Sequence, residues 1–458
     1  GGVCDLSHDD TLIIKNCSLD GNASMMLGGN IVAYGRTVAE FTNCSISNGI
    51  GGLAGCGAIY MINEKSNANI SNCSFKSNTG GISSGAFGSA GTANISDSEF
   101  IGNFISSSLG GGGAIITSGS NSVLNVTNSR FEGNSAGGYG KIGNYTHGTD
   151  GGAIYLSGGN NKFKNCYIVG NYATGQGGGV YSSDSNTVFE DCTIANNSVV
   201  NKDTSDDANG GGLYLYKGTV VLTGTTNLTG NALLINSETD VSSSTNNLVC
   251  ESKLMVTLTD SSSGKTLGAG SRIGVTAAEG TKFATGATDE MKKYFFDDAK
   301  VLGVAYDSSD NTLSLATGGD MTGAEAETAD ADLYYKDSKF YSDSACTKDT
   351  EKTKLSDAMG ILYNGGKIHM LSKYSSTADE KVDITGNTTI VRDSSFTNDS
   401  MFEIKGGTFT INATSVAASI IFDGGNVDTT GTSGGVFHVI GNTAKLVLNG
   451  TKIDESNR

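Results

Sequence analysis

Proline and tryptophan are both absent from this sequence of 458 residues, and charged residues make up only 17% of it. Proline lacks a backbone N–H, so its absence suits a chain whose strands all use their N–H groups in ladders. Disorder usually accompanies high charge and few β-branched residues, which is not the composition found here. No apolar run approaches the roughly 18 residues of a transmembrane helix. These absences favour a folded chain over a disordered or membrane-spanning one.

Glycine is the residue in excess, because its 66 copies are about twice the usual share. Glycine combined with abundant Asn, Ser and Thr and with steady Val and Ile is typical of many short strands joined by tight turns. The formal net charge of -17 makes a surface that repels phosphate backbones and anionic lipids. We therefore expect no nucleic acid partner and no membrane insertion in this segment. The opening residues resemble the middle of a repeat, so we interpret the chain as part of a longer protein.

Two short motifs recur along the first half of the chain. One is an apolar residue followed three positions later by Asn, and its copies end at Asn22, Asn78, Asn103, Asn134, Asn171, Asn197 and Asn231. The other is a glycine-rich segment that leads into a strand, and its copies lie at 55–60, 111–116, 151–155, 177–181 and 210–214. The length of the repeat varies in the segment after the Asn, as expected if turns vary and strands do not.

A repeat of about 25 residues cannot bury its apolar face alone, so it must stack on its neighbours. Parallel pairing of equivalent strands, about 4.8 Å apart, then produces a solenoid with columns of equivalent residues. The sequence predicts an all-β fold, a right-handed parallel β-helix, with the hand taken from the usual crossover rule. We expect the recurrent Asn to occupy a turn in the αL conformation with stacked, bonded amides. We also expect one aromatic column, formed by Tyr60, Tyr155, Tyr181 and Tyr214.

Five of the nine cysteines share one repeat position, namely Cys17, Cys44, Cys73, Cys166 and Cys192. Other copies of the repeat carry Ser98, Ser129 and Thr225 there, which predicts a slot for a small inward side chain. A disulfide framework is not favoured. A metal site is favoured still less, because the sequence has no CxxC motif and no cluster of His and Cys.

The repeat pattern divides the chain into three parts. Residues 1–319 form a first β-helix module, with clear coils to about residue 231 and looser coils, an irregular segment and a terminal hairpin after it. Residues 320–349 form an acidic linker and a short hairpin. Residues 350–458 contain a capping helix over 350–366, where Leu355, Met359 and Leu362 share one face, and a second β-helix module that is cut short.

The motifs resemble those of a known group of proteins. The FxxN copies Phe75–Asn78, Phe100–Asn103 and Phe131–Asn134, with the GGA[ILV] copies Gly112–Ile115 and Gly151–Ile154, resemble the repeats of chlamydial polymorphic outer membrane proteins and of other adhesin-type β-helical surface proteins. The later part is similar, less specifically, to repetitive surface proteins of gut anaerobes. The resemblance implies a secreted or surface-attached protein, extracellular in location, that binds a glycan or protein of host or neighbouring cells.

Two long loops carry the candidate binding residues. They cover residues 135–150 and 198–210, and the side chains of interest are Tyr139, Lys141, Tyr145, His147, Asp150, Lys202, Asp203, Asp206 and Asp207. If both loops leave one corner of the solenoid, they lie roughly 10 Å apart along its axis. They could then form a shared site for a sugar or for Ca²⁺, the only cofactor considered. The simpler interpretation is that these are solvated loop charges.

Catalysis has less support in the sequence. A glycoside hydrolase needs two carboxylates roughly 5–10 Å apart beside a groove that fits a sugar. Asp97 and Asp191 share a repeat position with Asn72, Asn128 and Asn165, which identifies them as turn residues. Our main hypothesis is a non-enzymatic adhesin, a stiff rod that presents binding loops. Two alternatives stay open: a polysaccharide-degrading lyase or hydrolase, and a structural protomer of an extracellular fibre that associates end to end.

Overall fold

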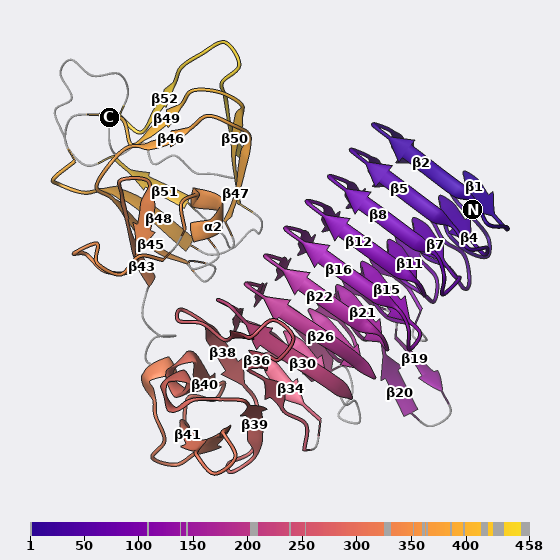
Figure 1. Cartoon of the computed structure of the whole chain (residues 1–458), viewed down its shortest axis with the longest axis horizontal. Coiled ribbons are helices and arrows are strands. Elements are labelled where there is room, and N and C mark those ends of the chain that lie inside the picture. The colour runs from indigo at the N-terminus through magenta and orange to yellow at the C-terminus, as the bar shows by residue number, and fades with distance from the viewer. Residues whose placement is uncertain are drawn as a thin grey trace. The chain divides into compact units, whose positions relative to one another are not determined.

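The computed structural model forms two compact units, residues 1–327 and 328–458, which are described separately (Figure 1). The structure describes the following residues: 2–107, 110–137, 139–142, 145–201, 209–237, 240–251, 253–324, 331–350, 352–359, 362, 365–384, 387–396, 399–413, 420–424 and 435–449. No helix in the described part of the chain is long and apolar enough to cross a membrane.

The first unit is a parallel β-helix, as predicted, whose coils stack as a row of near-parallel ribbons (Figure 1). A typical coil runs through four strands. The first strand of a coil belongs to the series β1 (Cys4–Leu6), β4 (Ile31–Ala33), β7 (Ile59–Met61), β11 (Phe87–Ser89), β15 (Ile115–Ser118), β21 (Ile154–Ser157), β25 (Val180–Ser183), β29 (Leu213–Leu215) and β34 (Leu248–Cys250). The second belongs to β2 (Thr11–Lys15), β5 (Val38–Thr42), β8 (Asn67–Ser71), β12 (Thr92–Ser96), β16 (Val123–Thr127), β22 (Asn160–Lys164), β26 (Ser185–Glu190), β30 (Gly218–Thr223), β35 (Val256–Thr257) and β39 (Lys282–Thr285).

The third and fourth strands complete the coil. The third series is β3 (Ser18–Asp20), β6 (Ser45–Ser47), β9 (Ser74–Lys76), β13 (Glu99–Ile101), β17 (Arg130–Glu132), β23 (Tyr167–Val169), β27 (Thr193–Ala195), β31 (Asn227–Thr229), β38 (Arg272–Val275) and β40 (Phe295–Asp297). The fourth is β10 (Thr79–Gly80), β14 (Phe104–Ile105), β18 (Ser135–Ala136), β24 (Tyr172–Ala173), β28 (Ser198–Asn201), β32 (Ala232–Ser237) and β33 (Asp240–Thr245). All coil-to-coil pairs are parallel except β32 with β33.

Alternating residues of each strand fill the interior. The rings of Phe75, Phe100 and Phe131 stack with centroids 4.6 and 5.0 Å apart, and all three are fully buried. The predicted slot for small inward residues is confirmed by the burial of Cys44, Cys73, Ser98, Ser129, Cys166 and Cys192. Cys17, predicted in the same slot, is exposed. The last member was assigned wrongly. Thr226, not Thr225, continues the slot, because Gly224 and Thr225 lengthen this turn by one residue and Thr226 Oγ1 accepts the Cys192 N–H at 3.4 Å.

A buried asparagine ladder runs through the repeat, as predicted. Each Nδ2 donates to Oδ1 of the Asn in the following coil at 2.8–2.9 Å, and the members are Asn78, Asn103, Asn134, Asn171, Asn197, Asn231 and Asn247. The same Oδ1 also accepts a backbone N–H from the preceding coil, as when Asn103 N donates to Asn134 at 3.0 Å. The second hydrogen of Nδ2 goes to a strand carbonyl, as from Asn134 to Phe100 at 2.9 Å. The donors and acceptors of the buried amides are therefore all hydrogen-bonded, so the amides can be buried without the cost of unpaired polar groups.

The predicted αL conformation of this Asn was wrong. The residue before it takes the positive φ, at Ser77, Gly102, Gly133, Gly170, Asn196 and Gly230. The αL asparagines lie at the other turn, between the second and third strands, where Asn43, Asn72, Asp97, Asn128, Asn165 and Asp191 have φ of 49 to 55°. Asp97 and Asp191 are thus turn residues, as the sequence indicated.

In one coil a substitution pair alters the ladder, since Asn30 Nδ2 is buried without a hydrogen-bond partner among the described residues and Gly49 N donates to Asn78 Oδ1 at 2.9 Å. Gly49 stands where the ladder Asn is expected, and Asn30 stands where the repeat has Ala. Asn22 Nδ2 donates to Asn30 Oδ1 at 2.7 Å. A Cβ on Gly49 would lie 2.5 Å from Asn30 Nδ2 and 2.9 Å from Asn78 Oδ1. The Asn30 amide therefore occupies the space that an Asn side chain at position 49 would fill.

The C-terminal end of the first unit is closed as the sequence predicted, by an irregular segment and a hairpin. A 3-10 helix, η1 (Asp289–Tyr294), precedes β40, and the hairpin β41 (Gly303–Asp307) and β42 (Thr312–Ala316) follows it. β42 pairs antiparallel with β39, so it covers the last edge of the second-strand sheet. Asp298 ends the asparagine ladder, because its carboxylate accepts Asn247 Nδ2 at 2.5 Å, Asn247 N at 2.8 Å and Thr276 Oγ1 at 2.6 Å.

The second unit is a smaller parallel β-helix with its own core. Its first strand begins in the predicted hairpin, because β43 pairs antiparallel with β44 and parallel with β45. Its strands are β43 (Ala331–Lys336), β44 (Lys339–Tyr341), β45 (Gly365–Met370), β46 (Tyr374–Ser376), β47 (Glu380–Ile384), β48 (Asn387–Arg392), β49 (Phe402–Ile404), β50 (Thr408–Ala413), β51 (Ile420–Asp423), β52 (Phe437–Val439) and β53 (Lys445–Asn449).

The predicted capping helix exists but is much shorter than 350–366. α2 covers Leu355–Ala358, and Leu355, Met359 and Leu362 are buried in the core of this unit, as their shared face indicated. The helix start is held by side chains from the coil: Leu355 N donates to Tyr374 Oη at 2.9 Å and Ser356 N to Glu380 Oε1 at 3.1 Å. A negative charge at a helix N-terminus is stabilising.

Candidate functional site

Both predicted binding loops leave the same corner of the first unit. One connects β18 to β21 and the other connects β28 to β29, and each link therefore joins a fourth strand to the first strand of the next coil. β21 pairs with β25 and β25 pairs with β29, so the two loops are two coils apart, as expected. The first loop contains an antiparallel hairpin, β19 (Tyr139–Ile142) and β20 (Tyr145–Gly148), which extends away from the stack in Figure 1.

The structure locates only part of the predicted residue set. Tyr139 and Lys141 belong to β19, and Tyr145 and His147 belong to β20, but their side chains lie outside the described part of the structure. In the second loop Lys202, Asp203, Asp206 and Asp207 also lie outside the described residues. A site shared between the two loops stays a prediction. The one predicted side chain that can be placed is Asp150.

Asp150 lies at the base of the β19–β20 hairpin, half-buried against the next coil. Its Oδ1 accepts the Gln176 N–H at 2.7 Å. A Cβ on Gly175 would lie 2.2 Å from the same oxygen, so the carboxylate rests directly on the Gly175–Gln176 backbone. Burial raises the pKa of Asp150 to about 7, and the hydrogen bond from Gln176 opposes this rise only in part. A carboxyl group with this pKa can hold a proton near neutral pH.

Next to Asp150 runs a tyrosine strip, which we define as Tyr155, Tyr181, Tyr214 and Tyr216. The first three occupy one outward column, as predicted, with centroids 4.9 Å apart at 18° and 6.0 Å apart at 4°. Tyr60, the fourth predicted member, has the same register position, but Gly88 and Ile116 separate it from Tyr155. Tyr216 stacks on Tyr181 at 6.0 Å. A Cβ on Gly111 would touch the Tyr155 ring at 2.2 Å, so the other face of that ring is covered by backbone. Tyr181 and Tyr214 are only 6% and 4% exposed, so these two rings offer no open face on which a sugar could stack, whereas Tyr216 is exposed.

Carboxylates border the tyrosine strip on neighbouring coils. Tyr214 Oη donates to Glu251 Oε2, and Asp184 forms an ion pair with Lys217 at 2.5 Å. Burial, with smaller effects from Asp150 and Asp184, raises the pKa of Tyr155 to about 12. The sequence predicted the tyrosine column but not these acids. Asp184 and Glu251 do not recur at one position of the repeat, so no sequence pattern places them beside the tyrosines.

A second candidate surface is the outward side of the sheet formed by the second strands, which we call the amide face. Asn69, Asn94 and Asn125 stand in one column of this face, and each later Nδ2 donates to the preceding Oδ1 at 3.0 Å. Ser71, Ser96 and Thr127 form the adjacent column of hydroxyls. These side chains are exposed or half-buried. The sheet thus offers solvent a regular array of donors and acceptors at the spacing of the strands.

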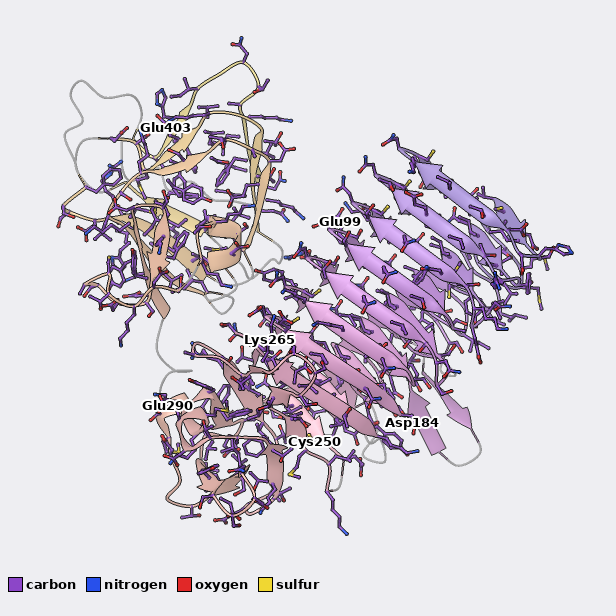
Figure 2. The ribbon with its side chains drawn as sticks, in the orientation of Figure 1. Glu99, Asp184, Cys250, Lys265, Glu290 and Glu403 are labelled. Atoms are coloured by element: carbon purple, nitrogen blue, oxygen red, sulfur yellow. The ribbon has the colours of Figure 1, made fainter. Side chains whose placement is uncertain are left out.

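The tyrosine strip and the far end of the amide face are separate places. Figure 2 shows Asp184 and Lys265 at opposite edges of the stack of strands. Within the part of the chain that the structure describes, no three His, Cys, Asp or Glu side chains are grouped so as to hold a metal ion, and calcium binding stays a prediction.

No family model matches the sequence, and no curated protein matches it.

Proposed function

We propose that the chain is a non-enzymatic, extracellular or cell-surface adhesin that binds a glycan of a host or neighbouring cell along its amide face. The observation that supports this is the column Asn69–Asn94–Asn125 with its hydroxyl column Ser71–Ser96–Thr127. Polymers with a regular repeat can place one sugar after another against such an array, so many weak hydrogen bonds act together.

Rigidity adds to the suitability of this surface. The residues of the amide face lie on central strands of a sheet that is paired on both sides along β5, β8, β12, β16, β22 and β26. A preorganised surface loses little conformational freedom on binding, so more of the contact energy remains as affinity. The hairpin β19–β20 offers a second, smaller contact region at another corner, in keeping with the binding loops expected from the sequence.

The test is retention of the full chain on a panel of neutral and acidic polysaccharides, with mass spectrometry of the supernatant to detect cleavage. The variant Asn94→Ala/Asn125→Ala removes two of the three amides of the column Asn69–Asn94–Asn125. Ser118→Ala, on the outward side of β15, is the matched control on another face of the same coil. We expect the double variant to lose at least about 10-fold in affinity and the control to lose nothing measurable. Equal retention of all three proteins would contradict the proposal.

A polysaccharide-degrading enzyme is the second candidate, because Asp150 combines a pKa of about 7 with a charge that acts on Tyr155 and Tyr181 of the tyrosine strip. A protonated carboxyl group is what a glycosidase needs as its general acid. This candidate predicts shortened chains in the supernatant, and it predicts that Asp150→Asn abolishes them while Asp97→Asn, at an exposed turn, does not. Cleavage that depends on Asp150 would replace the adhesin proposal.

A further inference from the structure

Three lysines converge on one glutamate at the end of the amide face. Lys164 Nζ lies 2.7 Å from Glu190 Oε1, and Lys162 Nζ lies 3.3 Å from Glu190 Oε2. Lys265 Nζ also bonds to Glu190 Oε1. Lys162 and Lys164 come from β22 and Glu190 from β26, whereas Lys265 comes from the hairpin of β36 (Thr259–Asp260) and β37 (Lys265–Thr266). We call this group the lysine cluster.

The arrangement is layered, with the negative charge inside and the positive charges outside. Only 2% of the Glu190 side chain is exposed, against 43%, 39% and 46% for Lys162, Lys164 and Lys265. Burial alone would raise the pKa of Glu190, but the three lysine hydrogen bonds together lower it to about 2. Glu190 is therefore ionised at neutral pH, and solvent at this point of an acidic protein meets ammonium groups.

The ammonium groups retain hydrogen-bonding capacity beyond Glu190. Three ammonium groups bring three donors each, while one carboxylate offers about four lone-pair sites. Two nearby acids are bound to other groups: Asp191 Oδ1 accepts Thr225 N at 2.9 Å, and Asp260 accepts Ser262 Oγ at 2.6 Å and Ser263 Oγ at 2.7 Å. Asp191 acts on Lys164 through its charge only. An external anion would meet several donors at once.

A purely structural role explains only one of the three lysines. The pair Lys265–Glu190 anchors the β36–β37 hairpin to a coil 75 residues earlier in the chain. Lys162 and Lys164 belong to β22, which already pairs with β26 through its backbone. Two further ammonium groups on the same carboxylate repel each other and add little to that anchor.

The lysine cluster continues the columns of the amide face. Lys162 stands directly after Asn125 in the amide column, and Lys164 directly after Thr127 in the hydroxyl column. We infer that the lysine cluster is a binding subsite for the carboxylate or sulfate groups of an acidic polysaccharide whose chain lies along the amide face. This inference rests on the proposed function, since it names the ligand class for the same surface.

The experiment compares the full chain with two variants in polymer binding. Lys162→Gln/Lys164→Gln removes two ammonium groups of the cluster. Lys15→Gln is the matched control, because Lys15 occupies the same column of the same sheet as Lys164 and forms a one-to-one pair with Glu40 at 2.8 Å. The probes are polygalacturonate for carboxylates, dextran sulfate for sulfates and dextran as the neutral polymer, each titrated at low and at physiological salt.

We expect the wild type and Lys15→Gln to bind one of the acidic polymers at least about 10-fold more tightly than the double variant, with a weaker effect at higher salt. The polymer that shows the difference identifies the anionic group. Equal affinity of the double variant and Lys15→Gln for both acidic polymers would overturn the inference.

A second measurement tests the cluster without any polymer. Inorganic sulfate and glucuronate are added to the full chain, and the melting temperature is followed. We expect the anions to raise the melting temperature of the wild type and of Lys15→Gln, but not that of the double variant. We expect a larger rise in melting temperature for Glu190→Gln, because this variant lacks the carboxylate that the three lysines bind in the wild type. No difference among these proteins would contradict the subsite.

The two measurements separate the subsite from the proposed function. Stabilisation by small anions without retention on any polymer would support the subsite and contradict the proposed function. Equal retention of neutral and acidic polymers, unchanged by the lysine variants, would support the proposed function and overturn the subsite.

Discussion

The two units are both parallel β-helices, yet they hold their turns in different ways. In the first unit the buried ladder repeats one amide per coil from Asn78 to Asn247. In the second unit one buried arginine gathers several turns. Arg392 is 5% exposed, and its guanidinium donates to the carbonyls of Phe396, Asp399, Gly424 and Gly435.

The comparison shows two distributions of the same kind of interaction. In the ladder, buried backbone groups are hydrogen-bonded by many equivalent Asn side chains, and each Asn bonds only to groups of its own and the neighbouring coils. A central arginine concentrates such bonds in one side chain, and four carbonyls lose a donor together if the side chain is removed, of which Gly435 O keeps the Met401 N–H at 3.3 Å. The first unit should tolerate local change, and the second should be sensitive to one position.

The largest effect is expected at that position. Arg392→Met keeps much of the apolar stem but removes the guanidinium donors to the carbonyls of Phe396, Asp399, Gly424 and Gly435. We expect the second unit to lose about 3–5 kcal/mol of stability. Hydrogen–deuterium exchange of the full chain should show faster exchange in residues 365–413 and unchanged exchange in the coils of the first unit. Uniform loosening of both units would contradict the comparison.

A single step of the ladder is expected to matter less. Asn134→Ala removes the acceptor for Asn103 N and Nδ2 and the donor to Phe100 O and Asn171 Oδ1. We expect a loss of about 2–4 kcal/mol, with faster exchange limited to the adjoining coils. Asn125→Ala, in the same coil but on the exposed amide face, is the control and should cost less than about 0.5 kcal/mol. Equal losses of stability in Asn134→Ala and Asn125→Ala would contradict the prediction that the buried amides stabilise the coil more than the exposed ones.

The substitution pair Asn30 and Gly49 tests whether stability depends on an amide at the ladder position itself or only on an amide in the same space. Gly49→Asn alone should clash with Asn30, and Asn30→Ala alone should leave Asn22 without its acceptor. The double variant restores the ordinary repeat. We expect the two singles to lose about 1–3 kcal/mol each and the double to recover the part of the Gly49→Asn loss that comes from Asn30, a coupling measured by a double-mutant cycle. The contact of a Cβ at position 49 with Gly57 O, at 2.3 Å, remains in both variants that carry Gly49→Asn. Additive losses would show that the two positions are independent.

The smallest effect is a pH dependence at Asp150. Its pKa of about 7 lies above the ordinary 3.8, so the folded state binds the extra proton between these values and stability falls as pH rises through them. We expect Asp150→Asn to remove about 1–2 kcal/mol of this fall, so the variant melts higher than the wild type at pH 8 and similarly at pH 4. Asp184→Asn is the control, since that exposed carboxylate pairs with Lys217 at the surface. Parallel melting curves of Asp150→Asn and wild type across pH would refute the assignment.

Much of the fold was predictable because the repeat records itself in the sequence. Columns such as Tyr155–Tyr181–Tyr214 and the buried Asn follow from equal spacing within strands. What failed lies outside the period: the extra residue at Gly224–Thr225 shifted one slot, and α2 has four residues where the sequence predicted a helix over 350–366. The hand of the coil stays a prediction.

The candidate sites were less predictable for the same physical reason. The lysine cluster joins β22 to a hairpin whose Lys265 lies 75 residues after Glu190 in the sequence. No local sequence pattern predicts that these two residues are in contact. Asp150 was selected from its loop, but its raised pKa comes from burial against the next coil, and the hydrogen bond from Gln176 N opposes that rise. Loop composition indicates where such groups lie, whereas their burial depends on the neighbouring turn.

Asp298 gives the buried ladder a direction and an end. Every Asn in it is a bifunctional unit, with an Nδ2 that donates to the later coil and an Oδ1 that accepts from the earlier one. The ionised form of Asp298 only accepts, and it takes both the side-chain and the backbone N–H of Asn247. In the language of polymer chemistry, Asn is a propagating monomer and Asp298 is the chain terminator. Coils could be inserted or removed between Asn78 and Asn247 without changing the direction in which the amides donate. The Oδ1 of an amide placed after Asp298 would receive no hydrogen bond from the Asp298 side chain, because an ionised carboxylate has no hydrogen to donate.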